Sequence, residues 1–488
     1  MQQKITLSDI KFHPHSFGDR TVRLFRLDGE IYRAIKGERA AFFKNLFETG
    51  LIQRLIEKGL LIESELTNLK LENYDLVIRH RMIRFNSYPN EWCAAMLKDG
   101  MLTMLDLASE LARHGLTLGD AHPWNLMFDT EKNRPVFVDL GSIIPLDSSV
   151  WSVYDEFCRF CFYPLILMAN DLDEIARLLM FEDRGVVKSD VVELVGKSSL
   201  TQKEIRVGLF GLIESKLRQQ IVKLPDSYRQ KIKQYLLRIE NIVASKNNEN
   251  LNSSVTIENI KQKSHSEFLQ TIRKAVNNID LNWQKNEFFS VEIVPSFFPD
   301  SSWTETQKSI YQILTERKPT SVLDISYQPG WYAQLAATLG SQTISFDTDR
   351  NWTTQLYFDS LEKKIPLLPL VMDFTKTTPA RGLGNHWSIA AGDRLACDLV
   401  LALGIVDRMV RQRRLNFEQI VEGFALFSQQ WLIVEFAGEE NTEISQWRSD
   451  EFHWYTLENF ISALRQEFRQ VDILEPASQA SVLLVCQK

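Results

Sequence analysis

The last strands of the chain limit most strongly how it can fold. A helical segment at residues 456–468 is followed by two strand-like segments, residues 470–474 and 481–486, with only EPASQA between them. A connection this short joins antiparallel neighbours, because a parallel crossover needs about a dozen residues or more. The sequence therefore predicts that the chain finishes in an antiparallel hairpin.

Upstream of the hairpin, short apolar segments alternate with helical ones. Strands are predicted at residues 321–325, 343–347, 367–374, 398–403 and 431–436, and helices at 304–315, 331–339, 351–364 and 417–429. This alternation indicates a doubly wound parallel sheet. With the hairpin at its end, this Rossmann-like α/β sheet has seven strands. It resembles the class I methyltransferase fold more than a dinucleotide-binding dehydrogenase.

The turn after the first of these strands carries the first candidate cofactor residues. Ligands of such sheets lie beyond the carboxyl ends of the central strands. The stretch VLDISYQPG has Asp324 and Gly330 where methyltransferases usually have an acid and the last of several alternating glycines, while Ser326 and Gln328 replace the other two. By this resemblance Asp324 would hold the amino group of S-adenosylmethionine, directly or through water, and Ser326 and Gly330 would line the cofactor.

Two more acids stand at the ends of the next strands. Asp347 lies 23 positions after Asp324, about where an acid commonly accepts hydrogen bonds from ribose hydroxyls. Asp373 closes the third strand, where this fold often contacts the adenine amino group. Each acid alone also fits a helix cap or a turn. Three acids at successive strand ends predict a cofactor site together.

The resemblance extends over nearly the whole chain. The stretches VLDISYQPGWYAQLAA, LPLVMDF, CDLVLALGIVDRMV, WLIVEF and HWYTLENF look like a bacterial family of methyltransferases fused to a kinase-like N-terminal region. That family typically has glycine at the position of Ser326, and often a histidine pair at the positions of Asp407 and Arg408. The resemblance implies a seven-stranded methyltransferase domain and a bilobal, protein-kinase-like domain of α+β class.

The N-terminal half contains a motif similar to a kinase catalytic loop. The segment LGDAHPWN is followed, fourteen positions after Asn125, by Asp139 in VDLG. Protein kinases use Asp-x-x-x-x-Asn and then Asp-Phe-Gly, in which the first Asp receives a proton and the other two residues hold magnesium. Asp120 is thus the candidate base, and Asn125 and Asp139 are candidate ligands of Mg²⁺ if ATP is bound. The residues of the motif resemble those of aminoglycoside phosphotransferases more than those of protein kinases.

A lysine for the ATP phosphates is expected on an earlier strand. In IYRAIK, strand alternation puts Ala34 and Lys36 on one face, as in the kinase strand that carries this lysine. Glu48, in the following helix, is the candidate partner of Lys36. The sequence has no glycine-rich loop before Lys36, and a solvated strand lysine is the simpler interpretation. The alternative to a working kinase is a kinase fold kept as a scaffold or a substrate-docking module.

A polar segment marks the expected domain boundary. Residues 245–264 are rich in Asn and Ser and nearly free of large apolar side chains, as in a linker. We predict a kinase-like domain at residues 1–245, with a small lobe at about 1–90 and a helical lobe at about 91–245. A linker at 246–264 and a methyltransferase domain at 265–488 follow, the latter opening with a helix near residues 267–278.

The acceptor side of the methyltransferase sheet offers three candidate catalytic residues. Asp407 follows the fourth strand, Glu435 ends the fifth, and His453 lies in FHWYTL. Methyl transfer needs positioning of the acceptor and, where the acceptor loses a proton, a base. Each residue also fits a cap or packing role. Four arginines near the fourth strand suit an anionic acceptor or a solvated helix face: Arg408, Arg411, Arg413 and Arg414.

Composition restricts the partners and the compartment. The net charge of -7 argues against a surface built to bind nucleic acid. The sequence shows no signal peptide, and its most apolar stretch, residues 157–170, is too short to cross a membrane. Five cysteines in 488 residues suit a reducing cytoplasm. The pair Cys158 and Cys161 is interpreted as packing rather than as half of a zinc site.

Three functions are compatible with these features. The first is a methyltransferase that uses S-adenosylmethionine on a saccharide or another small or anionic acceptor, with the kinase-like region aiding recognition. The second is a bifunctional enzyme that uses ATP and Mg²⁺ to phosphorylate an acceptor, glycan or natural product, and then methylates it. The third is a degenerate protein that acts as a binding or assembly module.

Overall fold

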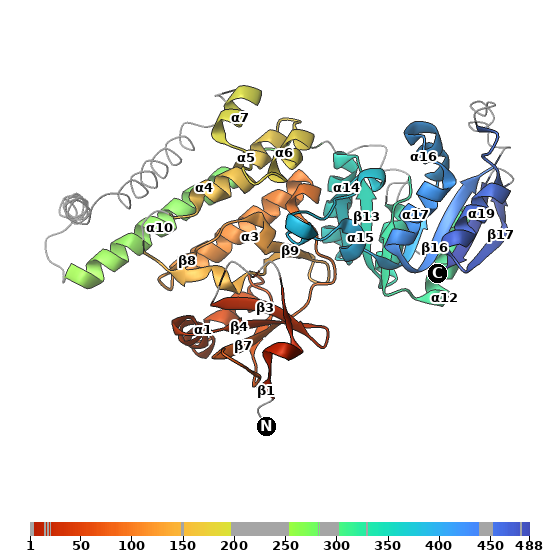
Figure 1. Ribbon diagram of the computed structural model, residues 1–488. Helices are drawn as coiled ribbons and strands as arrows, with labels where there is room; N and C mark the ends of the chain where they lie inside the picture. The colour runs from red at the N-terminus through yellow and green to blue at the C-terminus, as the bar shows by residue number, and fades with distance from the viewer. Residues whose placement is uncertain are drawn as a thin grey trace.

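Two regions of mixed strands and helices lie side by side in the computed structural model of the chain (Figure 1). The structure describes residues 4–13, 16, 19, 21–147, 151–196, 253–281, 283, 302–327, 330–438, 452–478 and 481–488. The helices predicted at residues 204–222 and 227–244 lie outside these ranges. Among the helices that are described, none is long and apolar enough to cross a membrane.

The N-terminal region is built on a five-stranded sheet of order β2-β3-β4-β7-β5, in which every neighbouring pair is antiparallel. The turn between β3 and β4 is tight because Asp28 and Gly29 both have positive φ, which glycine and short polar residues tolerate best. The elements are β1 (Lys4–Ile5), η1 (Leu7–Asp9), β2 (Lys11–Phe12), β3 (Val22–Leu27), β4 (Glu30–Ile35), α1 (Glu38–Glu48), α2 (Leu51–Glu57), β5 (Ser64–Leu66), β6 (Lys70–Leu71) and β7 (Leu76–His80).

Helix α3 (Ala94–Ala112) forms the centre of the adjoining helical layer and is buried along most of its length. Two short antiparallel pairs, β8 with β11 and β9 with β10, lie beside it. The apolar stretch at 157–170 is helical and buried, and burial raises the pKa of Cys158 to about 12. The elements are η3 (Pro89–Glu91), β8 (Leu116–Leu118), η4 (Pro123–Asn125), β9 (Leu126–Asp129), β10 (Arg134–Phe137), η5 (Leu140–Ser142), β11 (Ile143–Pro145), α4 (Tyr154–Phe157), η6 (Cys158–Phe162), α5 (Tyr163–Met168), α6 (Asp173–Met180) and α7 (Lys188–Leu194).

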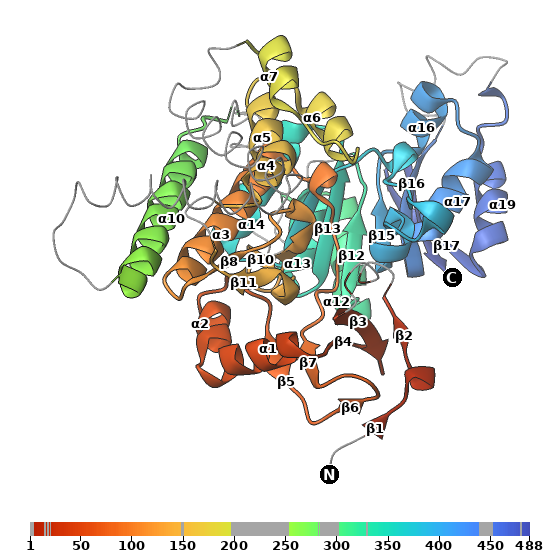
Figure 2. The ribbon, with the colours of Figure 1, turned by 60° about the vertical axis from the view of Figure 1, so that its left-hand side comes forward.

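Helix α10 (Ser253–Asn277) occupies much of the segment that the sequence predicted to be a linker. Residues 253–264 are helical, so the linker prediction is corrected for this part. The helix lies along α3 (Figures 1 and 2), where Leu269 and Val276 are fully buried and Arg273 pairs with Asp106 at 2.5 Å. A helix that packs against the protein on one side only keeps polar residues on its other side. Because this makes its composition polar overall, composition alone predicts a linker for such a segment.

The C-terminal sheet has seven strands in the order β14-β13-β12-β15-β16-β18-β17. All neighbouring pairs are parallel except those of β18, which is antiparallel to both β16 and β17. This confirms the predicted doubly wound sheet and its closing hairpin. The second strand of the hairpin inserts between β16 and the first. The last strand therefore pairs with β16 along its whole length and with β17 over most of it.

The strands of this sheet alternate with helices nearly as predicted. Helix α16 lies where the sequence left a solvated helix face open as one interpretation of its arginines, without bounds. The elements are α12 (Glu305–Arg317), β12 (Ser321–Asp324), α13 (Trp331–Thr338), β13 (Gln342–Asp347), α14 (Arg350–Lys363), β14 (Leu367–Val371), η8 (Phe374–Lys376), η9 (Leu383–Asn385), α15 (Ala391–Arg394), β15 (Cys397–Ala402), α16 (Val406–Arg413), α17 (Phe417–Phe427), β16 (Ser428–Ala437), α19 (Leu457–Glu467), β17 (Gln470–Ser478) and β18 (Ser481–Gln487).

The two regions share one continuous apolar core. The largest cluster of buried side chains runs from the N-terminal sheet through α3 to one face of the C-terminal sheet, whereas the side chains of the other face pack in two separate clusters. At the junction, the rings of Phe128 and Tyr357 meet edge to face with centroids 5.8 Å apart, and the Tyr357 hydroxyl donates to Asp99 at 2.7 Å. Burial of both partners makes this junction part of the folded interior rather than a loose contact between domains.

Candidate functional site

Asp324 ties the end of β12 to the first turn of α13. Its Oδ1 accepts from the Ser326 amide at 2.9 Å and its Oδ2 from the Ala333 amide at 2.9 Å. Burial raises the pKa of Asp324 to about 6, although these hydrogen bonds favour the ionised form. Asp324 therefore shapes the loop and satisfies an amide of the helix start. A contact between Asp324 and a cofactor amino group stays a prediction.

Ser326 holds the loop against the neighbouring strand. Its buried Oγ accepts from the Leu403 amide at 3.1 Å, and the next amide, of Tyr327, donates to the Leu403 carbonyl at 2.9 Å. The loop thus extends the parallel pairing of β12 with β15 by three residues. The hydroxyl of Ser326 satisfies a buried amide at the position where the resembling family has glycine. Gln328 lies outside the described residues.

Gly330 is required by backbone conformation and by packing. Its φ is 67°, in the left-handed region that glycine adopts without strain. A Cβ at this position would lie 2.4 Å from Cδ2 of Leu356 in α14. The space beside Gly330 is therefore filled by a side chain of the protein. The sequence assigned Gly330 to the cofactor, and the structure gives it a packing reason that the sequence did not show.

Asp347 is the strand-end acid with the most capacity left for a ligand. It ends β13, and its Oδ1 accepts from the Asp349 amide at 2.8 Å. Burial, with a smaller contribution from the charge of Asp349, raises the pKa of Asp347 to about 6. Within the described part of the chain no Lys or Arg forms an ion pair with it. A buried carboxylate without a cation gains most from hydrogen-bond donors.

Asp373, the third strand-end acid, is already paired. Its Oδ1 accepts from the amide and the hydroxyl of Thr375, at 2.8 and 2.7 Å, and its Oδ2 accepts from Arg413 at 2.6 Å. Arg413 comes from the last turn of α16. An adenine amino group would therefore share this carboxylate with a guanidinium. The adenine contact of Asp373 stays a prediction.

The three predicted catalytic residues of the C-terminal region lie on different elements and differ in exposure. Asp407 is in the first turn of α16, and burial raises its pKa although Arg408 and Arg411 lower it in part. Glu435 is half-buried near the end of β16, with its Oε2 3.9 Å from where a Cβ on Gly404 would lie. His453 is exposed in the turn before α19. Glu435 thus lies nearest to the loop of β12.

The arginines of α16 contact the protein itself. The Arg408 guanidinium stacks on the Tyr327 ring, 3.1 Å from its centroid, so α16 covers the loop of the first strand. Arg414 lies 5.1 Å from the ring centroid of Phe452 and Arg413 pairs with Asp373. These contacts involve guanidinium groups that the sequence analysis considered as binding groups for an anionic acceptor.

The kinase-like motif comes together beneath the N-terminal sheet. Asp120 follows β8 and accepts from the His122 amide at 2.9 Å. Burial raises the pKa of Asp120, and the charge of Asp139 adds to this, so the two acids face one interior region. The buried amide nitrogen of Asn125, Nδ2, has no hydrogen-bond partner among the described residues. Asp120 and Asp139 therefore lie near one another, and the roles of all three residues stay predictions.

A third acid belongs to this group and was missed. Glu156 of α4 accepts from the Ala121 amide at 3.0 Å, and burial together with the charge of Asp120 raises the pKa of Glu156 to about 7. It stands 36 positions after Asp120, on a helix whose register the sequence did not fix. Two neighbouring carboxyl groups with raised pKa values are expected to share a proton near neutral pH.

The cation beside Asp139 is Arg33, not Lys36. The Arg33 Nη1 lies 2.7 Å from Asp139 Oδ1. Burial works to raise the pKa of Asp139, but the Arg33 charge and hydrogen bonds from Ser142 and Gly141 lower it overall. Lys36 lies over the Tyr74 ring, 5.8 Å from its centroid.

The placement of Lys36 follows from strand parity. Ala34 packs in the cluster with Phe25 on the outer side of the sheet, whereas Ile35 packs in the main core. Ala34 and Lys36 do share a face, as predicted, but it is the face away from Asp139. Glu48 is exposed and lies 3.7 Å from Lys44, so it does not pair with Lys36.

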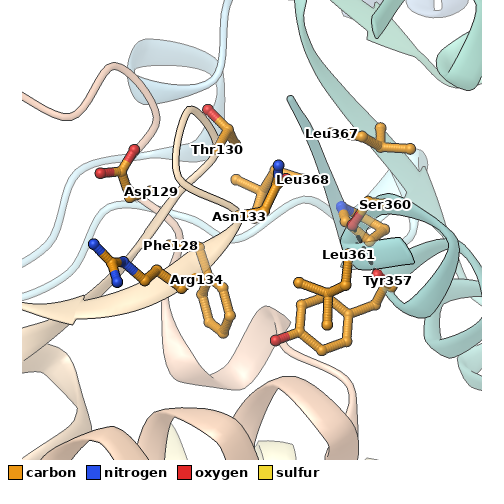
Figure 3. Close-up of a pocket in the computed structure, with 11 residues that line it drawn as sticks. Phe128, Asp129, Thr130, Asn133, Arg134, Tyr357, Ser360, Leu361, Leu367 and Leu368 are labelled. Atoms are coloured by element: carbon orange, nitrogen blue, oxygen red, sulfur yellow. Dashed lines mark hydrogen bonds between the residues drawn. The ribbon is translucent and has the colours of Figure 1, made fainter. Parts of the chain in front are cut away.

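No metal centre is formed by side chains alone within the described ranges. No group of three or more His, Cys, Asp or Glu residues there has the spacing of a metal site. A small pocket lies between the two regions instead (Figure 3). Phe128 and Arg134 of the β9–β10 hairpin wall one side, and Tyr357 and Leu361 of α14 the other. None of the predicted site residues lines this pocket.

Comparison with known proteins gives one similar relative over almost the full length. No model of a known protein family matches the chain. The chain is 23% identical over 477 residues to the nodulation protein NoeA of Rhizobium meliloti (strain 1021), covering 94% of this chain and 92% of that protein.

Several solved methyltransferases match part of the chain. N-methyltransferase NodS from Bradyrhizobium japonicum is 10% identical, covering 38% of this chain and 96% of NodS, with a TM-score of 0.28. Magnesium protoporphyrin IX methyltransferase from Synechocystis PCC 6803 with bound SAH is 11% identical, covering 39% and 91%, with a TM-score of 0.26. WbdD is 14% identical, covering 38% of this chain and 39% of WbdD, with a TM-score of 0.28. TM-scores this low do not establish a shared function.

Proposed function

We propose that residues 265–488 bind S-adenosylmethionine and transfer its methyl group to a small-molecule or glycan acceptor. The observation that carries the proposal is Asp347, a half-buried carboxylate at the end of β13 with no Lys or Arg paired to it among the described residues. It stands at the carboxyl edge of a doubly wound sheet, where such folds bind ligands. Ribose hydroxyls are donors that suit this carboxylate.

The residues near Asp347 would support the rest of the cofactor by holding the loop after β12 in place. Asp324 and Ser326 fix the backbone of the loop by hydrogen bonds on both sides, so its open edge is held in one conformation. Arg408, stacked on Tyr327, covers that loop from the acceptor side. When bound, S-adenosylmethionine supplies an electrophilic methyl group. The residues of this chain position it and exclude water from it.

Glu435 is the better-placed candidate base. It is half-buried beside Gly404, and its charge acts on Tyr332, which opens α13 next to the loop. Asp407 is half-buried as well, and burial raises its pKa, so its carboxyl keeps its proton to a higher pH than a free carboxyl does. We assign Glu435 to orienting the acceptor or receiving its proton, and Asp407 to the support of α16. His453 is exposed and has a weaker claim.

We propose a kinase-like domain for residues 1–245, extended in space by α10, as the platform for the methyltransferase region. The five-stranded antiparallel sheet, the helix α1 after β4, and the meeting of Asp120 with Asp139 support the kinase-like arrangement. The aromatic contact between Trp124 and Trp387, with centroids 5.6 Å apart, joins the motif loop to the segment between β14 and β15. The N-terminal region thereby supports the acceptor side.

A binding experiment tests the proposal directly. The full chain is titrated calorimetrically with S-adenosylhomocysteine, the unreactive product form of the cofactor. Loss of a hydrogen bond to a charged group costs about 1.5–3 kcal/mol, so Asp347→Asn should weaken binding by about tenfold or more. Asp359→Asn, which neutralises a half-buried acid of α14 that accepts from Gln355, is the matched control and should bind as the wild type does. Absence of binding to the wild type at millimolar ligand would refute the proposal.

A further inference from the structure

The kinase-like motif implies magnesium at Asn125 and Asp139, and the surroundings of Asp139 do not fit that ion. The Arg33 guanidinium is 2.7 Å from Asp139 Oδ1, and Arg33 is only 5% exposed. A positive group is therefore already in contact with the carboxylate. A divalent cation on the same oxygen would lie beside a fixed guanidinium, and like charges at such a separation repel strongly in a protein interior.

Arg33 is fixed from its other side as well. Its Nε donates to Nε2 of buried His80 at 3.3 Å, and Nδ1 of the same ring is 2.7 Å from Ser64 Oγ. An imidazole nitrogen that accepts a hydrogen bond carries no proton, so the ring is neutral and adds no charge beside Arg33. Arg33 is consequently held in place rather than free to swing away from Asp139.

The turn after Asp139 is built around this guanidinium. A Cβ on Gly141 would lie 2.6 Å from Arg33 Nη1 and 3.0 Å from Asp139 Oδ1. Glycine at this position thus makes room for the ion pair. In kinases the same glycine belongs to the metal-binding motif, so the sequence alone assigns it to the wrong partner.

The remaining capacity of Asp139 is also used within the turn. The Gly141 amide donates to its Oδ1 at 3.2 Å, and the Ser142 hydroxyl donates to its Oδ2. Arg39 of α1 closes the turn by donating to the carbonyls of Gly141 at 2.5 Å and Ile143 at 3.3 Å. Both carboxylate oxygens therefore have donors before any ligand arrives.

We propose that the Arg33 guanidinium is the permanent counter-charge of Asp139, in the role that a kinase gives to magnesium. The N-terminal site is then independent of divalent metal and performs no metal-dependent phosphoryl transfer. Asp139 and Arg33 anchor β4 to the η5 turn, and the region acts as a binding platform. This inference does not depend on methyl transfer by the C-terminal region.

Manganese, a paramagnetic substitute for magnesium, tests the metal part of the inference. The full chain is titrated with Mn²⁺ in the presence of a non-hydrolysable ATP analogue, and free Mn²⁺ is measured by electron paramagnetic resonance. Wild type and Asp139→Asn should deplete free Mn²⁺ to the same small extent. A wild-type affinity tighter than about 1 mM that Asp139→Asn weakens tenfold or more would overturn the proposal.

Thermal unfolding tests the anchoring part with matched variants. Arg33→Met leaves the half-buried Asp139 without its cation and should lower the Tm by about 5 °C or more, whereas Lys36→Met, just after the same strand, should change it by about 1 °C or less. EDTA should leave the wild-type Tm unchanged. Arg33→Lys, which keeps the charge, should recover part of the loss. Equal shifts in Arg33→Met and Lys36→Met, or a wild-type Tm that falls with EDTA, would contradict the proposal.

Discussion

The guanidinium of Arg394 and the carboxylate of Glu91 form a buried ion pair that joins the two regions of the chain. Arg394 Nη1 lies 3.0 Å from Glu91 Oε2, and the two side chains are 3% and 1% exposed. Glu91 Oε2 also accepts from the Tyr88 amide at 2.8 Å, and the Tyr88 ring lies 4.0 Å from the Arg394 guanidinium carbon. Each charge is thus satisfied by the other region.

Removal of one partner of this pair should destabilise the whole protein. Arg394→Met leaves the Glu91 carboxylate buried without its cation, which costs about 3–5 kcal/mol of the free energy of unfolding. Arg465→Met, an exposed arginine on α19, is the control and should change this free energy by about 0.5 kcal/mol or less. Urea unfolding followed by circular dichroism gives both values. A loss in Arg394→Met no larger than in the control contradicts the structure.

Ser326→Ala should reduce stability through the amide that it leaves behind. The buried Leu403 amide loses its acceptor, and an unsatisfied buried donor costs about 1–3 kcal/mol. Ser326→Gly loses the same bond and adds about 0.5–1 kcal/mol of backbone entropy. Unfolding free energies should therefore fall in the order wild type, Ala, Gly. A glycine variant as stable as the wild type would show that the hydroxyl of Ser326 contributes nothing.

Gly330→Ala should destabilise in a way that depends on Leu356. The positive φ costs about 1–2 kcal/mol for a residue with a Cβ, and the Cβ itself overlaps the Leu356 side chain. Leu356→Ala removes the overlap at the expense of a cavity. The double variant should lose less than the sum of the single losses, by about 0.5–3 kcal/mol. Strictly additive losses, measured by chemical unfolding, argue against the contact.

Cofactor affinity should weaken as pH falls through 6. Burial raises the pKa of Asp347 from its ordinary 3.8 to about 6 in the unliganded protein. Ribose hydroxyls bind the ionised form, so binding requires loss of a proton. At pH 5 about one tenth of the carboxylate is ionised, which predicts an affinity about tenfold weaker than at pH 7. Calorimetry with S-adenosylhomocysteine in two buffers of different protonation enthalpy also counts the protons released. A Kd that does not change from pH 5 to 7 excludes this role of Asp347.

The raised pKa values of Asp324 and Asp347 also make the stability of the unliganded protein depend on pH. The pKa values of Asp324 and Asp347 are higher in the folded than in the unfolded chain, so the folded state binds more protons between about pH 4 and 6. Their contribution to stability is present at low pH and is lost as pH rises through 6. Bound cofactor should stabilise the ionised form of Asp347 and so reduce the stability that Asp347 loses as pH rises through 6.

The strands of the C-terminal sheet could be predicted because each is a short apolar run between polar turns, and the closing hairpin followed from six intervening residues. The same reasoning found Asp324, Asp347 and Asp373 at neighbouring strand ends. It did not reveal their partners. Arg413 reaches Asp373 from α16, where the sequence left a solvated helix face and an anionic acceptor open, and Leu356 fills the space beside Gly330 from a different helix.

The N-terminal strand β4 shows a different limit. Alternation along a strand tells which residues share a face, but not which face points to the interior. Arg33 and Lys36 are three positions apart and so lie on opposite faces, and only the packing of Ala34 and Ile35 in different clusters decides between them. Where an arginine lies three residues before the lysine of such a motif, the sequence therefore does not decide which of the two cations faces the interior.

Helix α10 has a practical consequence for dissecting this chain. It follows the N-terminal region in sequence, but Leu269, Ile272 and Val276 complete the buried side of α3, and Lys98 donates to the carbonyls of Asn277 and Ile279 at 3.1 and 2.7 Å. A truncation after residue 245 would strip α3 of this cover and leave an apolar stripe in water. A fragment that begins at residue 265 would carry the same stripe on α10. Fragments divided after residue 281 would keep the two helices together.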